Sequence, residues 1–101
     1  MAVVKIKFLP ASMMMGMYRP EQKQYAQDAL AAGLYVEESE LFTVDGDSKD
    51  AAEEVFDLTN NPGRCEERFE KYGNGRSLSV GDVVVVGEEQ WLCCSFGWAE
   101  V

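Results

Sequence analysis

Apolar and polar residues alternate along the start of the chain, over residues 2–9. A period of two predicts a half-buried strand, which Pro10 ends. The apolar face of this strand carries Val4, Ile6 and Phe8, and the opposite face carries Lys5 and Lys7. Residues 12–17 follow and contain four methionines. They are predicted to form a loop that either fills gaps in the core or offers an adaptable binding surface.

Two later segments show the spacing of amphipathic helices. Residues 20–33 form the first, which ends at Gly33. The second is capped by Asp47 or Ser48 and is terminated by residues 60–63, Asn-Asn-Pro-Gly. The predicted apolar stripes are Tyr25, Ala26, Ala29 and Leu30 in the first helix and Ala51, Ala52, Val55, Phe56 and Thr59 in the second.

The segments that flank the second helix are also patterned. Residues 34–44 return to an extended pattern before it, and residues 45–47 form a turn. A short helix is predicted after it, ended by the glycines of residues 73–75. One side of this short helix carries Cys65, Phe69 and Tyr72, and the other carries Glu66, Glu67 and Glu70.

The last third of the chain is predicted to be a β element. Residues 83–86 are four valines, which suits a central strand covered on both faces. After a tight connection, residues 90–96 form the return strand, with Trp91 and Cys93 on one face. The order β-α-β-α-(α)-β-β predicts one α+β domain over residues 1–101, with a mixed or antiparallel sheet of about four strands and two to three helices.

The net charge of −9 is unevenly distributed. Residues 35–70 hold twelve acidic and three basic residues. Such a field repels nucleic-acid phosphates and attracts basic partners, which argues against direct nucleic-acid binding. A solvated helix face without a partner explains the same pattern.

The absence of histidine restricts the chemistry of the chain. It excludes Ser-His-Asp and Cys-His arrangements and removes the commonest acid–base catalyst. Cys65, Cys93 and Cys94 are an odd number of cysteines and too few for a four-ligand zinc site. We interpret them as small buried side chains, with a redox or metal role as the alternative. We therefore expect no enzyme, no catalytic residue, no metal and no cofactor.

The cellular compartment follows from what the sequence lacks. No apolar run reaches the roughly 18 residues of a membrane-spanning helix. The N-terminus lacks the apolar stretch and cleavage site of a signal peptide, and unpaired cysteines suit a reducing compartment. We expect a cytoplasmic protein with no membrane partner.

The sharpest local motif is Gly75-Arg-Ser-Leu-Ser-Val-Gly-Asp82, which directly precedes the four valines. Ser79, Gly81 and Asp82 favour a turn held by side-chain-to-backbone hydrogen bonds. Arg76 is predicted to bond to nearby carbonyls or to Asp82, a structural role, with contact to a ligand as the alternative. The segment does not match the Gly-x-x-x-x-Gly-Lys-Ser/Thr phosphate-binding loop.

This motif, with Trp91-Leu-Cys-Cys-Ser-Phe-Gly-Trp98, resembles the YodL-like family. The family pattern reads Gly-[His/Arg]-Ser-Leu-Ser-Val-Ser-Asp-Val-[Val/Ile], followed by a hairpin that ends in Asp-Ser-Phe-Gly-Phe. The resemblance covers residues 35–101, so residues 1–34 form an N-terminal strand and helix extension. Gly81 stands where the family has Ser, and Cys94 where it has Asp. The resemblance implies an accessory protein of plasmids, conjugative elements or phages with an antirestriction or other counter-defence role, and it implies no catalytic residue.

The leading hypothesis is a non-enzymatic protein-binding module of a mobile genetic element, whose acidic surface engages a DNA-binding host or element protein. The alternative is a nucleic-acid adaptor that stacks bases on Trp91 and Trp98 of the C-terminal hairpin. A homodimer formed through an exposed edge strand is a further option. The candidate binding residues are Glu53, Glu54, Asp57, Glu66, Glu67, Arg76, Ser77, Ser79, Asp82 and Trp98.

Overall fold

The computed structural model describes residues 1–101 and contains one six-stranded sheet in which all neighbouring strands are antiparallel. The strands are β1 (Ala2–Phe8), β2 (Glu37–Glu38), β3 (Phe42–Val44), β4 (Val83–Val86), β5 (Glu89–Cys93) and β6 (Trp98–Glu100). Their order is β2-β1-β4-β5-β6, and β3 also pairs with β1. The first 34 residues thus supply a strand in the middle of the sheet.

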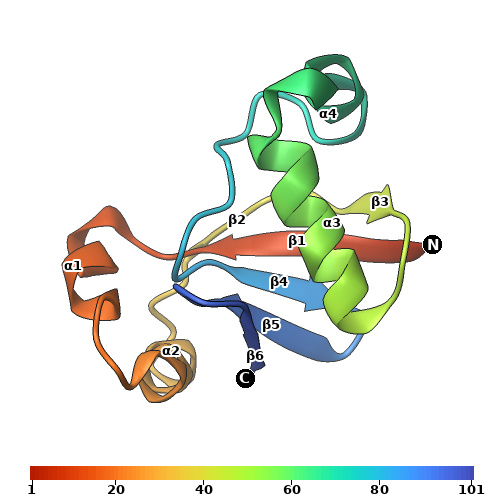
Figure 1. Ribbon diagram of the computed structural model, residues 1–101. Coiled ribbons are helices and arrows are strands. Elements are labelled where there is room, and N and C mark those ends of the chain that lie inside the picture. Colours follow the sequence, from red (N-terminus) through yellow and green to blue (C-terminus); the bar gives the residue numbers. More distant parts are fainter.

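The helices lie on both faces of this sheet (Figure 1). They are η1 (Ala11–Met13), α1 (Met14–Met17), α2 (Gln22–Ala31), α3 (Ser48–Asn60), η2 (Pro62–Arg64) and α4 (Cys65–Lys71), where η denotes a 3₁₀ turn. Helix α3 crosses one face, while α1 and α2 cover one end of the other. The predicted α+β class is confirmed, with more strands and helices than the sequence indicated.

The larger core lies between α3 and the sheet. Val4, Ile6 and Phe8 face it from β1, as the alternation predicted. The short side chains of Ala51 and Ala52 let α3 approach the strands closely. Further members of this core are Phe42, Val44, Val55, Leu58, Leu78, Val84 and Val86.

The smaller core lies on the opposite face, beneath α2. Ala26 and Ala29 of α2 pack there with Val83 and Leu92 of the sheet. Because Val84 faces the larger core and Val83 faces the smaller one, β4 is covered on both faces, as predicted. Leu9, Met17 and Tyr35 complete the smaller core.

The extended segment at residues 34–44 is split into β2 and β3, where one continuous strand was predicted. Both pieces pair with the same edge of β1. At the break, the Ser39 N–H donates to the Ile6 carbonyl, and the Ser39 hydroxyl accepts from the Ile6 N–H at 2.8 Å. The serine side chain therefore replaces one backbone acceptor of the ladder.

The methionine-rich segment is helical, and the prediction of a loop was wrong. It must carry the chain from the end of β1 to α2, and a helical path satisfies part of its own backbone, beginning with Met13 N–H to the Pro10 carbonyl at 2.9 Å. Met17 is fully buried, whereas Met15 is exposed. The segment thus fills the core with one residue and leaves another in solvent.

The apolar faces predicted for α3 and α4 were partly wrong. In α3, Leu58 is buried and Phe56 is exposed, because Leu58 lies two turns after Ala51 and so falls on the same stripe. In α4, Cys65 and Phe69 are exposed. Arg68 turns inward in their place and donates to the Thr59 and Gly75 carbonyls. Asp47 occupies the N-cap of α3 without a side-chain capping bond.

The return strand ends at Cys93, earlier than the predicted Phe96. Residues 94–97 form a turn in which the Cys94 N–H donates to the Gly97 carbonyl at 3.0 Å. Gly97 adopts φ +81°, a conformation that glycine accepts without strain. The chain then forms β6, which the sequence did not predict.

Candidate functional site

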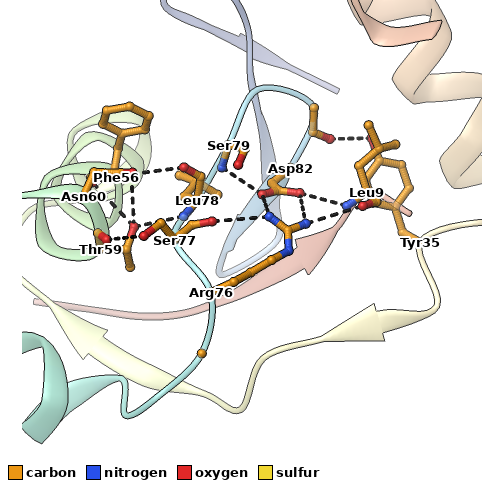
Figure 2. A network of polar contacts seen from close by, with 12 residues as sticks. Leu9, Tyr35, Phe56, Thr59, Asn60, Arg76, Ser77, Leu78, Ser79 and Asp82 are labelled. Carbon is orange, nitrogen blue, oxygen red and sulfur yellow. Dashed lines mark hydrogen bonds and ion pairs between the residues drawn. The ribbon is translucent and has the colours of Figure 1, made fainter. Parts of the chain in front are cut away.

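Asp82, at the entrance to β4, is the centre of the motif (Figure 2). Its side chain is 1% exposed and accepts four hydrogen bonds. The Leu9 N–H and the Ser79 N–H each donate to it at 2.8 Å. Arg76 donates from both terminal nitrogens, also at 2.8 Å. Four donors match the capacity of a carboxylate, so Asp82 has no site left for a ligand.

Arg76 closes the motif from the solvent side. Its guanidinium lies 4.4 Å from the ring centre of Phe8, and its side chain is 40% exposed. A second contact runs from Arg76 Nη2 to the Leu9 carbonyl at 3.4 Å. The predicted bond between Arg76 and Asp82 is confirmed, and it joins the motif to the end of β1.

The turn before Asp82 requires glycine at position 81. Gly81 adopts φ +98°, and a Cβ there would lie 2.6 Å from a methyl of Leu9. Its N–H donates to the Cys93 carbonyl at 2.8 Å, which extends the pairing of β4 with β5. Glycine at this position, where the YodL-like pattern has serine, therefore suits the local backbone and the close approach of Leu9.

Tyr35 belongs to the same network, although sequence reasoning did not identify it. Its hydroxyl donates to the Gly81 carbonyl at 2.7 Å (Figure 2). Burial, with a smaller contribution from the negative charge of Asp82, raises the pKa of Tyr35 well above its ordinary value. The same two causes, burial first, raise the pKa of the Cys93 thiol to about 12. Both groups therefore stay protonated at neutral pH.

A second branch of the network joins the motif to the C-terminal end of α3. The Ser77 hydroxyl donates to the Thr59 carbonyl at 2.7 Å, and the Thr59 hydroxyl accepts from the Leu78 N–H at 3.1 Å. Asn60 donates to the Leu78 carbonyl at 3.0 Å (Figure 2). Arg68 adds a bond of 2.7 Å to the Thr59 carbonyl. The bonds from Ser77 and Arg68 satisfy the Thr59 carbonyl, which the end of α3 leaves unpaired.

The polar side chains of the motif therefore bond to other parts of the same chain. The candidate residues Arg76, Ser77, Ser79 and Asp82 all lie in this network, which ties together β1, α3, α4 and β4. No buried side-chain nitrogen or oxygen in the structure lacks a hydrogen-bond partner. Thr59 could have indicated this branch of the network from the sequence, because it is a polar residue within a predicted apolar stripe.

The acidic candidates gather at a different place, where α3 meets α4. Arg64 donates to Glu54 at 2.7 Å, to Asp57 at 2.8 Å and to Glu67 at 2.8 Å. These three hydrogen-bonded carboxylates raise the pKa of Arg64. Arg64, and after it Lys71, lower the pKa of Glu67 to about 2. Glu67 therefore stays ionised at every physiological pH.

Three more acids of the two helices, Glu53, Glu66 and Glu70, are exposed and form no ion pair. We call the six acids and Arg64 the acidic surface; its carboxylates are Glu53, Glu54, Asp57, Glu66, Glu67 and Glu70. Only Arg64 and Lys71 neutralise it, since Arg68 points toward the motif. Six carboxylates and two cations thus leave the surface with a surplus of four negative charges.

Trp98 is separate from both groups. It lies opposite Cys93 in the β5–β6 pair and packs, half-buried, against the larger core, as does Trp91. The Trp91 indole N–H donates to Glu89 at 3.2 Å. Packing against the core limits the ring faces that the two tryptophans offer for stacking on bases.

The three cysteines are the remaining candidates for redox or metal chemistry. All three cysteines are free thiols, and Cys65 is exposed, so its predicted burial was wrong. No three Cys, Asp or Glu side chains are grouped so that they could hold a metal ion. No helix in the structure combines the length and apolar character needed to cross a membrane.

No family model, curated protein or solved structure matches the chain. The resemblance of residues 35–101 to the YodL-like family therefore stays a prediction that rests on the motif. The geometry separates two elements: a motif that is bonded internally and an acidic surface that carries surplus charge.

Proposed function

We propose that this protein is a non-enzymatic binding module that engages a basic, DNA-binding protein through the acidic surface of α3 and α4. One observation carries the proposal: Arg64 draws carboxylates from both helices into one cluster and cannot neutralise them all. Surplus negative charge on a fixed surface accelerates encounter with a cationic partner and discourages nucleic acid.

The motif supports this role by holding the surface in shape. Ser77 and Arg68 bind the last turn of α3, where the Thr59 carbonyl lies. Tyr72, directly after α4, donates to the Arg76 carbonyl at 2.6 Å. Because both helices are tied to the motif, the backbone that carries the carboxylates does not have to be ordered when a partner binds, and the entropic cost of association falls.

The resemblance to accessory proteins of plasmids, conjugative elements and phages supports a counter-defence setting. A protein that restricts foreign DNA must bind DNA phosphates with cationic side chains. An acidic surface that occupies those cations would block the DNA from binding. We therefore place antirestriction first among the roles of the proposed module, and we assign it no catalytic step.

The test is affinity capture from a bacterial lysate, with and without nuclease treatment and over a series of salt concentrations, followed by competition of each captured protein with duplex DNA. E53R and E66R reverse two exposed charges that have no ion pair, so both variants should fold. E88R, in the turn between β4 and β5, changes the net charge equally and is the matched control.

We expect the wild-type protein to capture a DNA-binding protein that salt and duplex DNA displace. E53R and E66R should lose this capture, and E88R should retain it. Equal capture by all variants would exclude the acidic surface as the binding site. Capture that disappears after nuclease treatment would favour the nucleic-acid adaptor instead.

A further inference from the structure

An exposed aromatic groove lies at the end of the molecule formed by α2 and the turn between β5 and β6. Phe96 is 97% exposed and Tyr18 is 62% exposed. The groove is lined by Tyr18, Arg19, Pro20, Gln22, Ser95 and Phe96. Two large aromatic side chains in solvent at one groove are the kind of feature that marks a protein interface.

The turn that carries Phe96 is held in a fixed shape. The Gln22 amide donates to the Ser95 hydroxyl at 2.8 Å and accepts from the Ser95 N–H at 3.1 Å. The same amide nitrogen also donates to the Met17 carbonyl at 3.0 Å. A phenyl ring presented on a turn that is tied to α2 loses little conformational freedom when it enters a partner.

The groove is lined by one cation without an acidic partner, Arg19, and a second such cation, Lys23, follows on α2. Arg19 lies 4.6 Å from the ring centre of Tyr25, and neither Arg19 nor the neighbouring Lys23 forms an ion pair. Glu21 is the nearby acid in the sequence and is also unpaired. The groove therefore fits an apolar surface flanked by carboxylates.

Helix α4 offers that chemistry in another part of the same molecule. A shallow hollow on its surface is lined by Cys65, Glu66, Phe69 and Glu70. Phe69 is 64% exposed, and neither glutamate forms an ion pair. In Figure 1, α4 projects beyond the sheet, away from α1 and α2. The hollow and the aromatic groove therefore lie on separate parts of the molecule.

We propose that copies of this protein associate head to tail, with the aromatic groove of one copy seated on the α4 hollow of the next. Phe96 would contact Phe69, and Arg19 with Lys23 would face Glu66 and Glu70. Because the groove and the hollow lie on separate parts of the molecule, one contact leaves a free hollow on one copy and a free groove on the other, so further copies can add. This inference goes beyond the proposed function, although Glu66 and Glu70 belong to both surfaces.

Sedimentation velocity of the full chain over a concentration series tests the association. The average mass should rise with concentration, and it should fall in about 1 M NaCl, where charges are screened within about 3 Å. F96S and F69S should each weaken association by about tenfold or more, because each removes an aromatic anchor. M15S removes an exposed apolar side chain outside both surfaces and should change nothing.

A mixture of F96S and F69S distinguishes contact between a groove and a hollow from contact between two grooves or two hollows. F96S keeps an intact hollow and F69S keeps an intact groove, so the mixture should form one-to-one dimers and nothing larger. All three residues are exposed, and circular dichroism verifies that each variant is folded. A wild-type protein that stays monomeric up to about 1 mM, single variants that associate normally, or a mixture that stays monomeric would each overturn the proposal.

Discussion

Two arginine–carboxylate groups of this protein use the same chemistry in different surroundings. Arg76 donates twice to Asp82 at 2.8 Å, and Asp82 is 1% exposed. Arg64 donates to three carboxylates at 2.7 to 2.9 Å, and the side chains of these acids are 23 to 55% exposed. The hydrogen-bond lengths barely differ, whereas the access of water differs greatly.

That difference assigns the two groups different roles. A buried carboxylate has lost its hydration, so removing one of its partners leaves an uncompensated charge or an unpaired donor. An exposed pair exchanges protein contacts for water at little cost, and salt screens it. We therefore expect the Asp82 network to determine stability and the Arg64 cluster to determine the charge that a partner meets.

The largest effect is expected for D82A. It removes the acceptor for the Leu9 and Ser79 N–H groups and leaves Arg76 without its ion pair. Breaking a buried pair costs about 3 to 5 kcal/mol of the free energy of unfolding, which urea denaturation measures. D45A, which removes an exposed acid, should change it by less than about 0.5 kcal/mol. Equal losses in the two variants would contradict a structural role for the motif.

R76K keeps the charge and tests the geometry. Lysine cannot donate to both oxygens of Asp82 in a fixed fork or stack its flat face on Phe8. We expect a loss of about 1.5 to 3 kcal/mol in urea denaturation, the range for a hydrogen bond to a charged group. R19K changes an arginine that stacks on Tyr25 without a carboxylate partner, and it should lose less. If both variants lose the same amount, stacking and not the paired hydrogen bonds holds Arg76.

T59V tests the branch that joins α3 to the motif. Valine has nearly the shape of threonine but leaves the Leu78 N–H without its buried acceptor. The expected loss is about 1 to 2 kcal/mol in the free energy of unfolding. T43V makes the same change at an exposed position of β3 and serves as control. A neutral T59V would mean that water reaches the Leu78 N–H.

R64Q tests the exposed member of the comparison. The Arg64 side chain is 20% exposed, but its partner carboxylates are 23 to 55% exposed, so removing it should cost about 1 kcal/mol or less in urea denaturation. The loss should shrink in about 1 M NaCl, because salt also screens the repulsion among the carboxylates left behind. K49Q, which removes an exposed cation with no ion pair, gives the background. A loss of several kcal/mol that salt does not change would show that Arg64, like Arg76, has a structural role.

The sequence predicted the elements that local periodicity encodes. The alternation in β1, the stripe of α2 and the four valines of β4 each lie within a few residues, so the pattern of neighbours was sufficient. The bond between Arg76 and Asp82 was predictable for a similar reason, because opposite charges six residues apart flank a turn.

The features that the sequence did not predict depend on contacts between residues that are distant in the sequence. Leu9 meets Asp82 across 73 residues, and Tyr35 meets Gly81 across 46, so no local pattern could reveal either bond. The exposure of Phe69 had the same origin, because Arg68 is drawn inward by carbonyls from α3 and the motif. The sequence placed the acids on two helices, and only the fold shows that Arg64 joins them.

The smallest effect is a pH dependence carried by Glu67. Arg64 and Lys71 lower its folded pKa from 4.5 to about 2, so the ionised form is the bound form. Its stabilisation is therefore complete above pH 4.5 and disappears as the pH falls through about 2. E67Q lacks this titration, and its deficit in melting temperature, measured by circular dichroism, should be present at pH 7 and should close near pH 2. E66Q removes an exposed acid without an ion pair and should melt like the wild type at pH 7. A deficit that stays constant from pH 7 to pH 2 would show that Glu67 acts through packing. The contrast between the exposed Arg64 cluster, whose stabilisation changes with pH, and the buried Asp82 network would then not hold at this residue.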